Sequence, residues 1–188
     1  MGVKSYSVPG MPADSGRIVH NFYVDYDVES IIDYFGRTIY FDINQATLRP
    51  ESKTRLDSFI PMLKENSGIG ISIEGHAEPR EASRNQPKPD QYLMKLGRQR
   101  ALAAYTYLRE KSVPAIQLIS ESYGGRRLAA PNSNPENRQL NRRVELKAVR
   151  VEDITLRIKQ RKAHSQTDTE SPSRMPRKRL KEKAPASR

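Results

Sequence analysis

The sequence predicts an α/β (α+β) sandwich, in which one mixed sheet of about four to five strands is covered by two main helices. Several short segments alternate apolar and polar residues, which is typical of half-buried strands. Two longer segments carry apolar residues at i, i+3, i+4 and i+7, the spacing of one helix face. Strand-like and helix-like segments follow one another in turn, so the helices should cross over between strands of a single sheet.

The first expected strands lie near the N-terminus. Residues 1–16 are rich in Gly and Pro, which is typical of a flexible lead-in. Between Asn21 and Val28, apolar residues alternate with polar ones and predict a strand. A second strand is expected at Arg37–Phe41 because this segment is β-branched and aromatic.

The first helix should begin at Pro50 and end near Asn66. Proline fits the first helical turn, where its missing N–H costs no hydrogen bond. Pro61 falls inside the expected helix and favours a kink or an early break. One face of this segment is apolar, through Leu56, Phe59, Ile60 and Leu63.

The second half of the chain repeats this alternation. A strand is expected at Ile69–Gly75, followed by a proline-containing loop over residues 79–90. The longest helix should cover Asp90–Lys111 and end before the next proline. Two further strands are expected, at Ile116–Tyr123 and Val144–Val151, the latter fraying near Ile158, with a long polar loop at residues 126–140 between them.

The length allows one domain with appendages, because the chain has 188 residues and domains cluster near roughly 100 to 150 residues. We expect an N-terminal extension with one strand at 1–36, the folded domain at 37–158 and a basic disordered tail at 159–188. The absence of cysteine excludes disulfides, a cysteine zinc site and a thiol nucleophile. No apolar run approaches the roughly 18 to 20 residues that cross a bilayer, and no signal peptide is recognisable.

The positive charge is concentrated at the C-terminus. Residues 161–188 contain nine Lys or Arg and three Asp or Glu, and so hold +6 of the formal charge of +11. Such a segment, rich in Ser and Pro and poor in apolar residues, is expected to be disordered and could contact any polyanion. It has no interleaved aromatic residues to stack on bases, so specific nucleic-acid binding is not expected.

Four motifs occur in one order along residues 38–151. They are YFDINQATLRP at 40–50, GHAE at 75–78, YLMKLGRQRA at 92–101 and NRRVE at 141–145. In kind and order they resemble the motifs of the OmpA-like C-terminal domain, the peptidoglycan-binding module shared by OmpA, Pal and MotB. The resemblance implies the OmpA-like version of the fold predicted above.

The resemblance also implies a site for the diaminopimelate of the peptidoglycan stem peptide. In this family an Asp at the end of the second motif and the Arg of the third bind that ligand, and these positions hold Glu78 and Arg100. Arg142 and Arg143 would border or brace the site, and Arg138 falls on another usual arginine. A ligand with an ammonium and a carboxylate suits such a pair, because Arg can hold a carboxylate through two parallel N–H bonds.

The sequence departs from the family pattern near this site. Glu78 is one methylene longer than the usual Asp, and Ala77 replaces a Thr. Leu93 and Gly97 replace the usual Asn and Ser. These changes imply either an altered ligand or a domain that kept the fold and lost the binding.

Each of these residues also has a purely structural interpretation. Glu78 as a loop glutamate would be solvated, and Arg100 would pair with a helix neighbour for about 0.3 to 0.5 kcal/mol. His76 invites a catalytic or metal role, but a structural histidine is the expectation because His20 and His164 are its only companions. No catalytic or phosphate-binding motif is present, so neither enzyme activity nor a cofactor or metal is expected.

The leading hypothesis is therefore a non-enzymatic module that anchors a bacterial envelope complex, such as a secretion or motility machine, to the cell wall. Its protein partners would dock on residues 1–36 or on the tail, in the periplasm, at the outer membrane or at the wall. One alternative is a degenerate OmpA-like scaffold that makes protein contacts without wall binding. Another is a basic nucleic-acid binder, whose affinity should fall steeply with salt.

Overall fold

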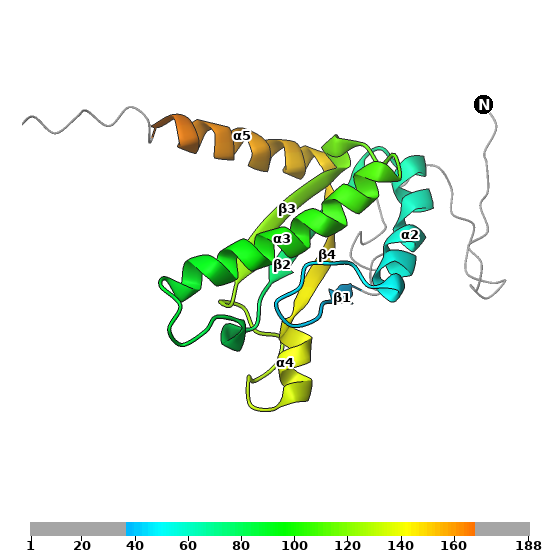
Figure 1. Cartoon of the computed structure of the whole chain (residues 1–188). Coiled ribbons are helices and arrows are strands. Elements are labelled where there is room, and N and C mark those ends of the chain that lie inside the picture. Colours follow the sequence, from blue (N-terminus) through cyan, green and yellow to red (C-terminus); the bar gives the residue numbers. More distant parts are fainter. Residues whose placement is uncertain (1–36, 168–188) are drawn as a thin grey trace, which may run out of the picture. The chain divides into compact units, whose positions relative to one another are not determined.

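The computed structural model describes residues 37–167, and its four strands form one mixed sheet (Figure 1). The spatial order of the strands is β1-β4-β2-β3. β2 and β3 are parallel, whereas β4 runs antiparallel to both of its neighbours, β1 and β2. The strands are β1 (Thr38–Tyr40), β2 (Ile69–His76), β3 (Leu118–Gly124) and β4 (Arg143–Arg150).

Helices connect the strands as the sequence predicts. The two that pack on the core are α2 (Pro50–Glu65) and α3 (Pro89–Glu110), and each joins two strands of the sheet. α2 continues through the exposed Pro61 and ends where the sequence predicts, so the proline does not break it. The other helical elements are η1 (Pro79–Glu81), η2 (Ala115–Gln117), α4 (Pro135–Asn141) and α5 (Val151–Thr167).

The hydrophobic core lies between the sheet and the helices α2 and α3. Ile71 and Ile73 of β2 belong to the same buried cluster as Phe59 of α2 and Ala104 and Leu108 of α3. The alternate positions of β2 are Ser72, Glu74 and His76, which point to the other face and are buried as well. β2 is thus a central strand buried on both faces, although its sequence alternates like a half-buried strand.

Two glycines let α3 lie directly against β2. A Cβ placed on Gly75 would lie 1.9 Å from the carbonyl oxygen of Gly97, and one on Gly97 would lie 2.8 Å from the carbonyl oxygen of Gly75. No larger residue fits this contact without moving the backbone. The contact brings Arg100, one helical turn after Gly97, against the carboxyl end of β2.

Two helices lie where the sequence suggested none. α4 occupies the end of the expected loop at residues 126–140, and the Asn134 side chain caps it by accepting the N–H of Asn137 at 2.7 Å. α5 follows β4 directly, so residues 159–167 are helical rather than disordered. The chain divides into two compact units after Thr155.

Two expectations fall outside the described residues, namely the strand at 21–28 and the tail beyond residue 167. Among residues 37–167, no helix combines the length and apolar character needed to span a bilayer.

Candidate functional site

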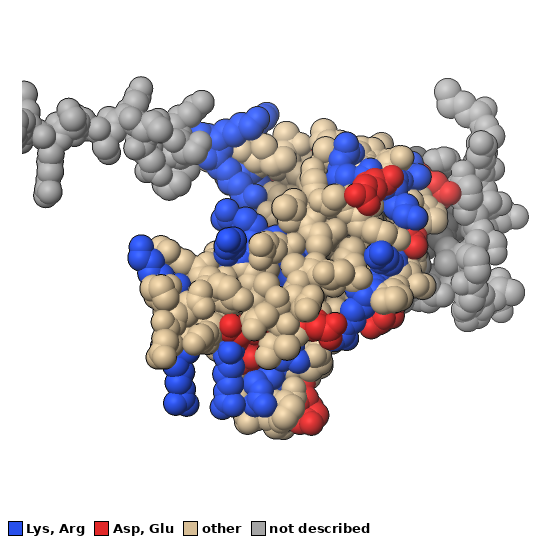
Figure 2. Space-filling model, viewed as in Figure 1, with Lys and Arg blue, Asp and Glu red and all other residues tan. Residues whose placement is uncertain are grey.

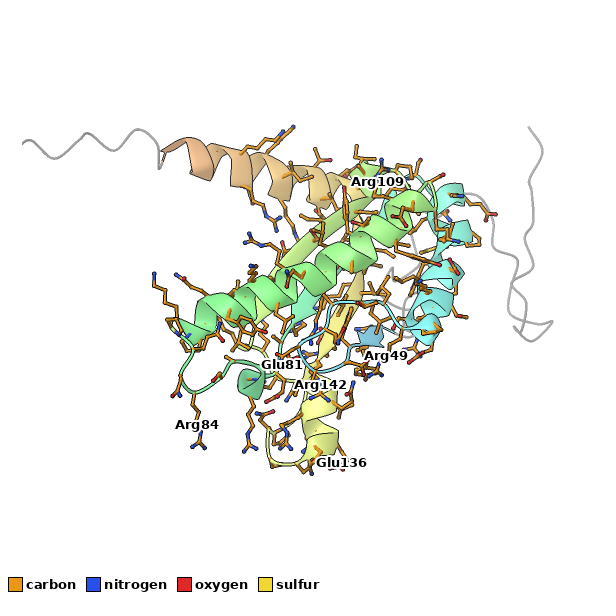
Figure 3. All side chains as sticks on the ribbon, viewed as in Figure 1. Arg49, Glu81, Arg84, Arg109, Glu136 and Arg142 are labelled. Carbon is orange, nitrogen blue, oxygen red and sulfur yellow. The ribbon has the colours of Figure 1, made fainter. Side chains whose placement is uncertain are left out.

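Three segments distant in sequence meet around one buried carboxylate at the carboxyl end of β2. They are the loop after β1, the short helix η1 after β2, and Arg100 in the middle of α3. The carboxylate belongs to Glu81, which is 4% exposed and is labelled in Figure 3. The carboxyl end of a parallel strand is where open α/β sheets usually place their ligands.

Arg100 is the centre of this arrangement. It is 0% exposed, and all five of its N–H groups donate to atoms of the protein. Three of these donors go to backbone carbonyls, those of Gln45, His76 and Asp42, at 2.9 to 3.0 Å. The other two hold Glu81 side by side, with Nη1 at 2.8 Å from Oε2 and Nη2 at 2.6 Å from Oε1.

The Glu81 carboxylate accepts two further hydrogen bonds from the backbone. The N–H of Asn44 donates to Oε1 at 2.7 Å, and the N–H of Glu78 donates to Oε2 at 2.8 Å. Asn44 has φ of 54°, a left-handed conformation that Asn adopts more readily than most residues. Each oxygen thus accepts one backbone and one guanidinium hydrogen bond, and the four donors define a site for a carboxylate.

Glu78 lies beside this site but turns its side chain elsewhere. Its Oε1 caps η1 by accepting the N–H of Arg80 at 2.8 Å, and it also accepts the amide of Asn132 at 2.6 Å. Glu78 is 1% exposed, so it is not a solvated loop charge. Together Glu78 and Glu81 form a capping box around η1.

The structure brings the predicted residues Glu78 and Arg100 to the same end of β2, without a hydrogen bond between their side chains among the described contacts. Glu78 and Arg100 are both buried at the end of β2, and both donate an N–H to Glu81. The carboxylate that faces the Arg100 guanidinium is Glu81, which the sequence analysis did not single out. The signal for Glu81 was the segment Glu-Pro-Arg-Glu at 78–81, whose first and fourth residues suit a capping box with proline at the first helical position.

The other three predicted arginines lie around this region in different ways. Arg142 follows α4 directly as its C-cap, donates to the side chain of Gln139, and has a buried Nε without a hydrogen-bond partner. Arg138 is partly exposed on α4 and donates to the carbonyl of Ser133 at 3.4 Å. Neither makes a hydrogen bond to Glu78, Glu81 or Arg100 among the contacts of the described residues.

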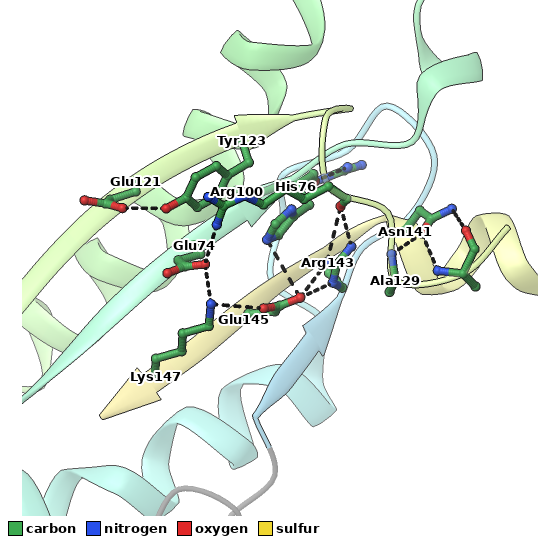
Figure 4. Close-up of polar contacts among 12 residues, drawn as sticks. Glu74, His76, Arg100, Glu121, Tyr123, Ala129, Asn141, Arg143, Glu145 and Lys147 are labelled. Atoms are coloured by element: carbon green, nitrogen blue, oxygen red, sulfur yellow. Dashed lines mark hydrogen bonds and ion pairs between the residues drawn. The ribbon is translucent and has the colours of Figure 1, made fainter. Parts of the chain in front are cut away.

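Arg143 points away from the carboxylate site. It lies on β4 and donates its Nε to Glu145 at 2.7 Å, within a polar cluster on the face of the sheet opposite α2 and α3; Figure 4 shows these contacts. None of its hydrogen bonds among the described residues reaches Glu78, Glu81 or Arg100, so the bracing role expected for Arg143 stays a prediction. Strand alternation explains this orientation, because Val144 and Leu146 of β4 are in the core and Arg143 and Glu145 must face the other way.

The polar cluster holds a histidine between opposite charges. His76 is 1% exposed, neither ring nitrogen has a hydrogen-bond partner, and its ring stacks on Tyr123 at 5.5 Å. Burial, helped by the positive charge of Arg143, lowers the pKa of His76 to about 4. His76 is therefore neutral at physiological pH.

The same cluster offers three groups that could coordinate a metal ion. Ligand atoms of Glu74, His76 and Glu145 lie within 4.8 Å of one another. However, Lys147 Nζ lies 2.7 Å from Glu74 and Arg143 pairs with Glu145, so both carboxylates are already neutralised. A divalent ion would have to displace these cations, which makes the cluster a charge-balanced structural network.

On the face drawn in Figure 2, the basic side chains of the described residues do not gather in one patch. Figure 2 shows Lys and Arg in separate groups on this face, with Asp and Glu among them. This distribution does not form the continuous basic stripe that tracks a nucleic-acid backbone.

Comparison with known proteins agrees with this architecture. A sequence model of the OmpA family matches residues 40–142. The peptidoglycan-associated lipoprotein of Pseudomonas aeruginosa is 36% identical over 110 residues, which are 58% of this chain and 61% of that protein. The peptidoglycan-associated lipoprotein of Rhizobium meliloti is 33% identical over 89 residues, 47% of either chain.

Two crystal structures share the fold. The peptidoglycan-associated lipoprotein of Burkholderia pseudomallei superposes with a TM-score of 0.54 at 24% identity, over 61% of this chain and 91% of that one. The C-terminal domain of Helicobacter pylori MotB gives a TM-score of 0.54 at 20% identity, over 72% of this chain and 97% of that one. The chain thus spans about three fifths of the length of the Pseudomonas relative.

Proposed function

The chain belongs to the OmpA family, and from that premise we propose that it is a non-enzymatic module that binds peptidoglycan and anchors an envelope complex to the cell wall. The family match covers residues 40–142, which include Glu78, Glu81 and Arg100, and two of the chain's relatives are peptidoglycan-associated lipoproteins. We place it accordingly in the periplasm, at the outer membrane or at the cell wall. Its protein partners would bind residues 1–36 or the basic C-terminal segment.

The proposed ligand is the diaminopimelate tip of the stem peptide, which presents an ammonium beside a carboxylate. Arg100 and the backbone N–H groups of Asn44 and Glu78 already form a site that fits one carboxylate through four donors. Glu78 supplies one of these donors through its backbone, and its buried side chain would turn from Arg80 and Asn132 to receive the ammonium. The observation that carries the proposal is this four-donor carboxylate site at the end of β2.

The test is cosedimentation of the protein with purified sacculi, with free meso-diaminopimelate as competitor. We expect Arg100→Lys to weaken binding by roughly tenfold or more, because lysine keeps the charge but cannot hold a carboxylate through two parallel bonds. Glu78→Gln should also weaken it. The matched controls are Arg84→Lys and Glu136→Gln, since both residues are exposed and lie away from the site (Figure 3).

Each variant is checked for folding by circular dichroism before sedimentation. Wild-type protein that stays in the supernatant at all concentrations would contradict wall binding by the native chain. Equal binding by Arg100→Lys and Arg84→Lys would show that the wall contact lies elsewhere on the domain.

A second candidate function is a scaffold that uses the OmpA-like fold for protein contacts. One observation favours it, namely that all five donors of Arg100 already have partners inside the protein. It predicts no sedimentation with sacculi, together with stable capture of envelope proteins by the tagged chain. A pull-down from envelope extracts, run beside the sedimentation assay, separates the two functions.

A further inference from the structure

We infer that Glu81 is an internal competitor for the carboxylate site, so that an incoming ligand carboxylate must displace the Glu81 side chain to reach Arg100. This inference rests on the proposed function for the identity of the ligand. The geometry of the site itself does not depend on that identity.

The Glu81 carboxylate is held by donors that would hold any carboxylate. Its two oxygens accept four hydrogen bonds, two from the Arg100 guanidinium and two from backbone N–H groups, at 2.6 to 2.8 Å. A guanidinium fork with converging backbone N–H groups recognises the carboxylate group and nothing specific to a glutamate side chain. The carboxylate of another molecule satisfies the same four donors in the same way.

The Glu81 side chain can leave the carboxylate site without disturbing the hydrophobic core. It ends the three-residue helix η1, and most of the next four residues, Ala82 to Asn85, are exposed. The donors, in contrast, are fixed, because Arg100 lies in the middle of α3 and makes three further bonds to backbone carbonyls. A local change in one short turn is therefore enough to exchange the carboxylate.

The charge of the site requires that one carboxylate replaces another. Arg100 is 0% exposed and pairs with Glu81, so an empty site would leave a buried guanidinium without its counter-ion. The outward position of Glu81 is therefore populated mainly when another carboxylate takes its place. A ligand whose tip is amidated cannot compensate the guanidinium, which restricts the substrate class to tips with a free carboxylate.

Competition of this kind lowers the apparent affinity by the fraction of time that the site is open. The decisive variant is Glu81→Ala, which removes the competitor and leaves the four donors in place. Its matched control is Glu136→Ala, an exposed glutamate on α4. If Glu81→Ala is too unstable to purify, Glu81→Gln serves in its place, because its neutral amide is a poor partner for the guanidinium.

The first measurement is thermal unfolding with and without acetate or meso-diaminopimelate. We expect either carboxylate to raise the Tm of Glu81→Ala, whereas acetamide does not, and wild type and Glu136→Ala should respond much less. Failure of both carboxylates to stabilise the Glu81 variants would overturn the inference, whatever the protein does with sacculi.

The second measurement is the affinity for sacculi. If the wild-type site is open about one tenth of the time, Glu81→Ala should bind roughly tenfold more tightly than wild type. Equal or weaker binding by a folded Glu81→Ala would also overturn the inference. If the Glu81 variants respond to acetate but no form of the protein sediments with sacculi, the internal competitor stands and the proposed wall binding fails.

Discussion

His76 shows how strongly one buried position can set the behaviour of a single residue. It lies at the end of the central strand β2, stacked on Tyr123, with Glu145 at 3.9 Å and the cations Arg143 and Lys147 nearby. Burial favours the neutral ring, and Arg143 adds to this effect, so the pKa falls to about 4. Around it, burial would raise the pKa of Glu145 and lower that of Lys147, but in each case the neighbouring opposite charges outweigh burial and keep the group ionised.

This environment predicts an acid-sensitive fold. The pKa of His76 in the unfolded chain is near 6.5, so the unfolded state takes up the proton first. The contribution of neutral His76 to stability is fully present above about pH 6.5 and is lost as the pH falls towards 4, with a total loss of about 3 kcal/mol. Urea unfolding between pH 7 and 5 measures the upper part of this loss, before the carboxylates titrate.

The control for this experiment is His76→Gln, which removes the titrating ring. Its stability should change much less between pH 7 and 5, even if it is lower throughout. A wild-type stability that stays constant over this interval would show that the buried ring is protonated as easily as in the unfolded chain.

The candidate site was predictable from the sequence only in part. The motif positions of Glu78 and Arg100 came from the resemblance to the OmpA-like domain, and the structure brings both residues to the end of β2, while their role in binding stays a prediction. Glu81 was missed because its role depends on a three-residue helix that folds its side chain back under Arg100. The orientation of Glu78 depends likewise on Asn132, which lies 54 residues away in the chain.

At the scale of elements, the contact between α3 and β2 is the most restrictive in the domain. Gly97 replaces the serine that is usual in the third motif, and the structure gives this position a packing role. A Cβ there would lie 2.6 Å from the hydroxyl of Ser122 and 2.8 Å from the carbonyl oxygen of Gly75. Because α3 carries Arg100, this contact also fixes the position of the site.

We expect Gly97→Ala to destabilise the protein by about 1 to 3 kcal/mol, the usual cost of overpacking. Helix propensity alone would give the opposite sign, since alanine is favoured over glycine in a helix by about 1 kcal/mol. The matched control is Gly125→Ala, whose nearest contact would be the mobile end of the Leu93 side chain at 3.1 Å. Chemical denaturation of both variants measures the difference, and a Gly97→Ala protein as stable as wild type would contradict the close packing.

The elements differ in how well the sequence predicts them. The helices α2 and α3 and the four described strands were predicted to within a few residues, because hydrophobic periodicity is a strong signal. The 17-residue α5 was missed, because its charged sequence predicted a fraying strand followed by a disordered tail. α4 and η1 were missed because they are short and depend on capping by Asn134 and Glu78. The end of α2 is similarly fixed from outside, by the buried amide of Gln117, which donates to the carbonyls of Leu63, Asn66 and Ile69.

For the whole molecule, the charge distribution separates two kinds of binding. Of the formal charge of +11, residues 161–188 hold +6, whereas the exposed cations drawn in Figure 2 form separate groups. We expect any retention of nucleic acid to weaken steeply between 50 and 200 mM salt and to disappear when residues 161–188 are deleted. Filter binding at several salt concentrations measures this, and sacculus binding by the truncated protein serves as the control.

Retention that survives the deletion would instead identify the folded domain as a nucleic-acid reader. It would require a continuous basic surface that Figure 2 does not show on this face.

The way Arg100 is satisfied also constrains the order in which the chain can assemble. Its hydrogen bonds reach Gln45 and Asp42, which precede it by 55 and 58 positions in the chain. They also reach Glu81 and His76, which precede it by 19 and 24 positions. If α3 packed on the sheet before these segments did, the Arg100 guanidinium would be buried in an apolar environment without its hydrogen-bond acceptors and its counter-ion. Such half-assembled forms are unfavourable, so we expect the loop after β1, the turn after β2 and the middle of α3 to acquire hydrogen-exchange protection together, as one cooperative unit.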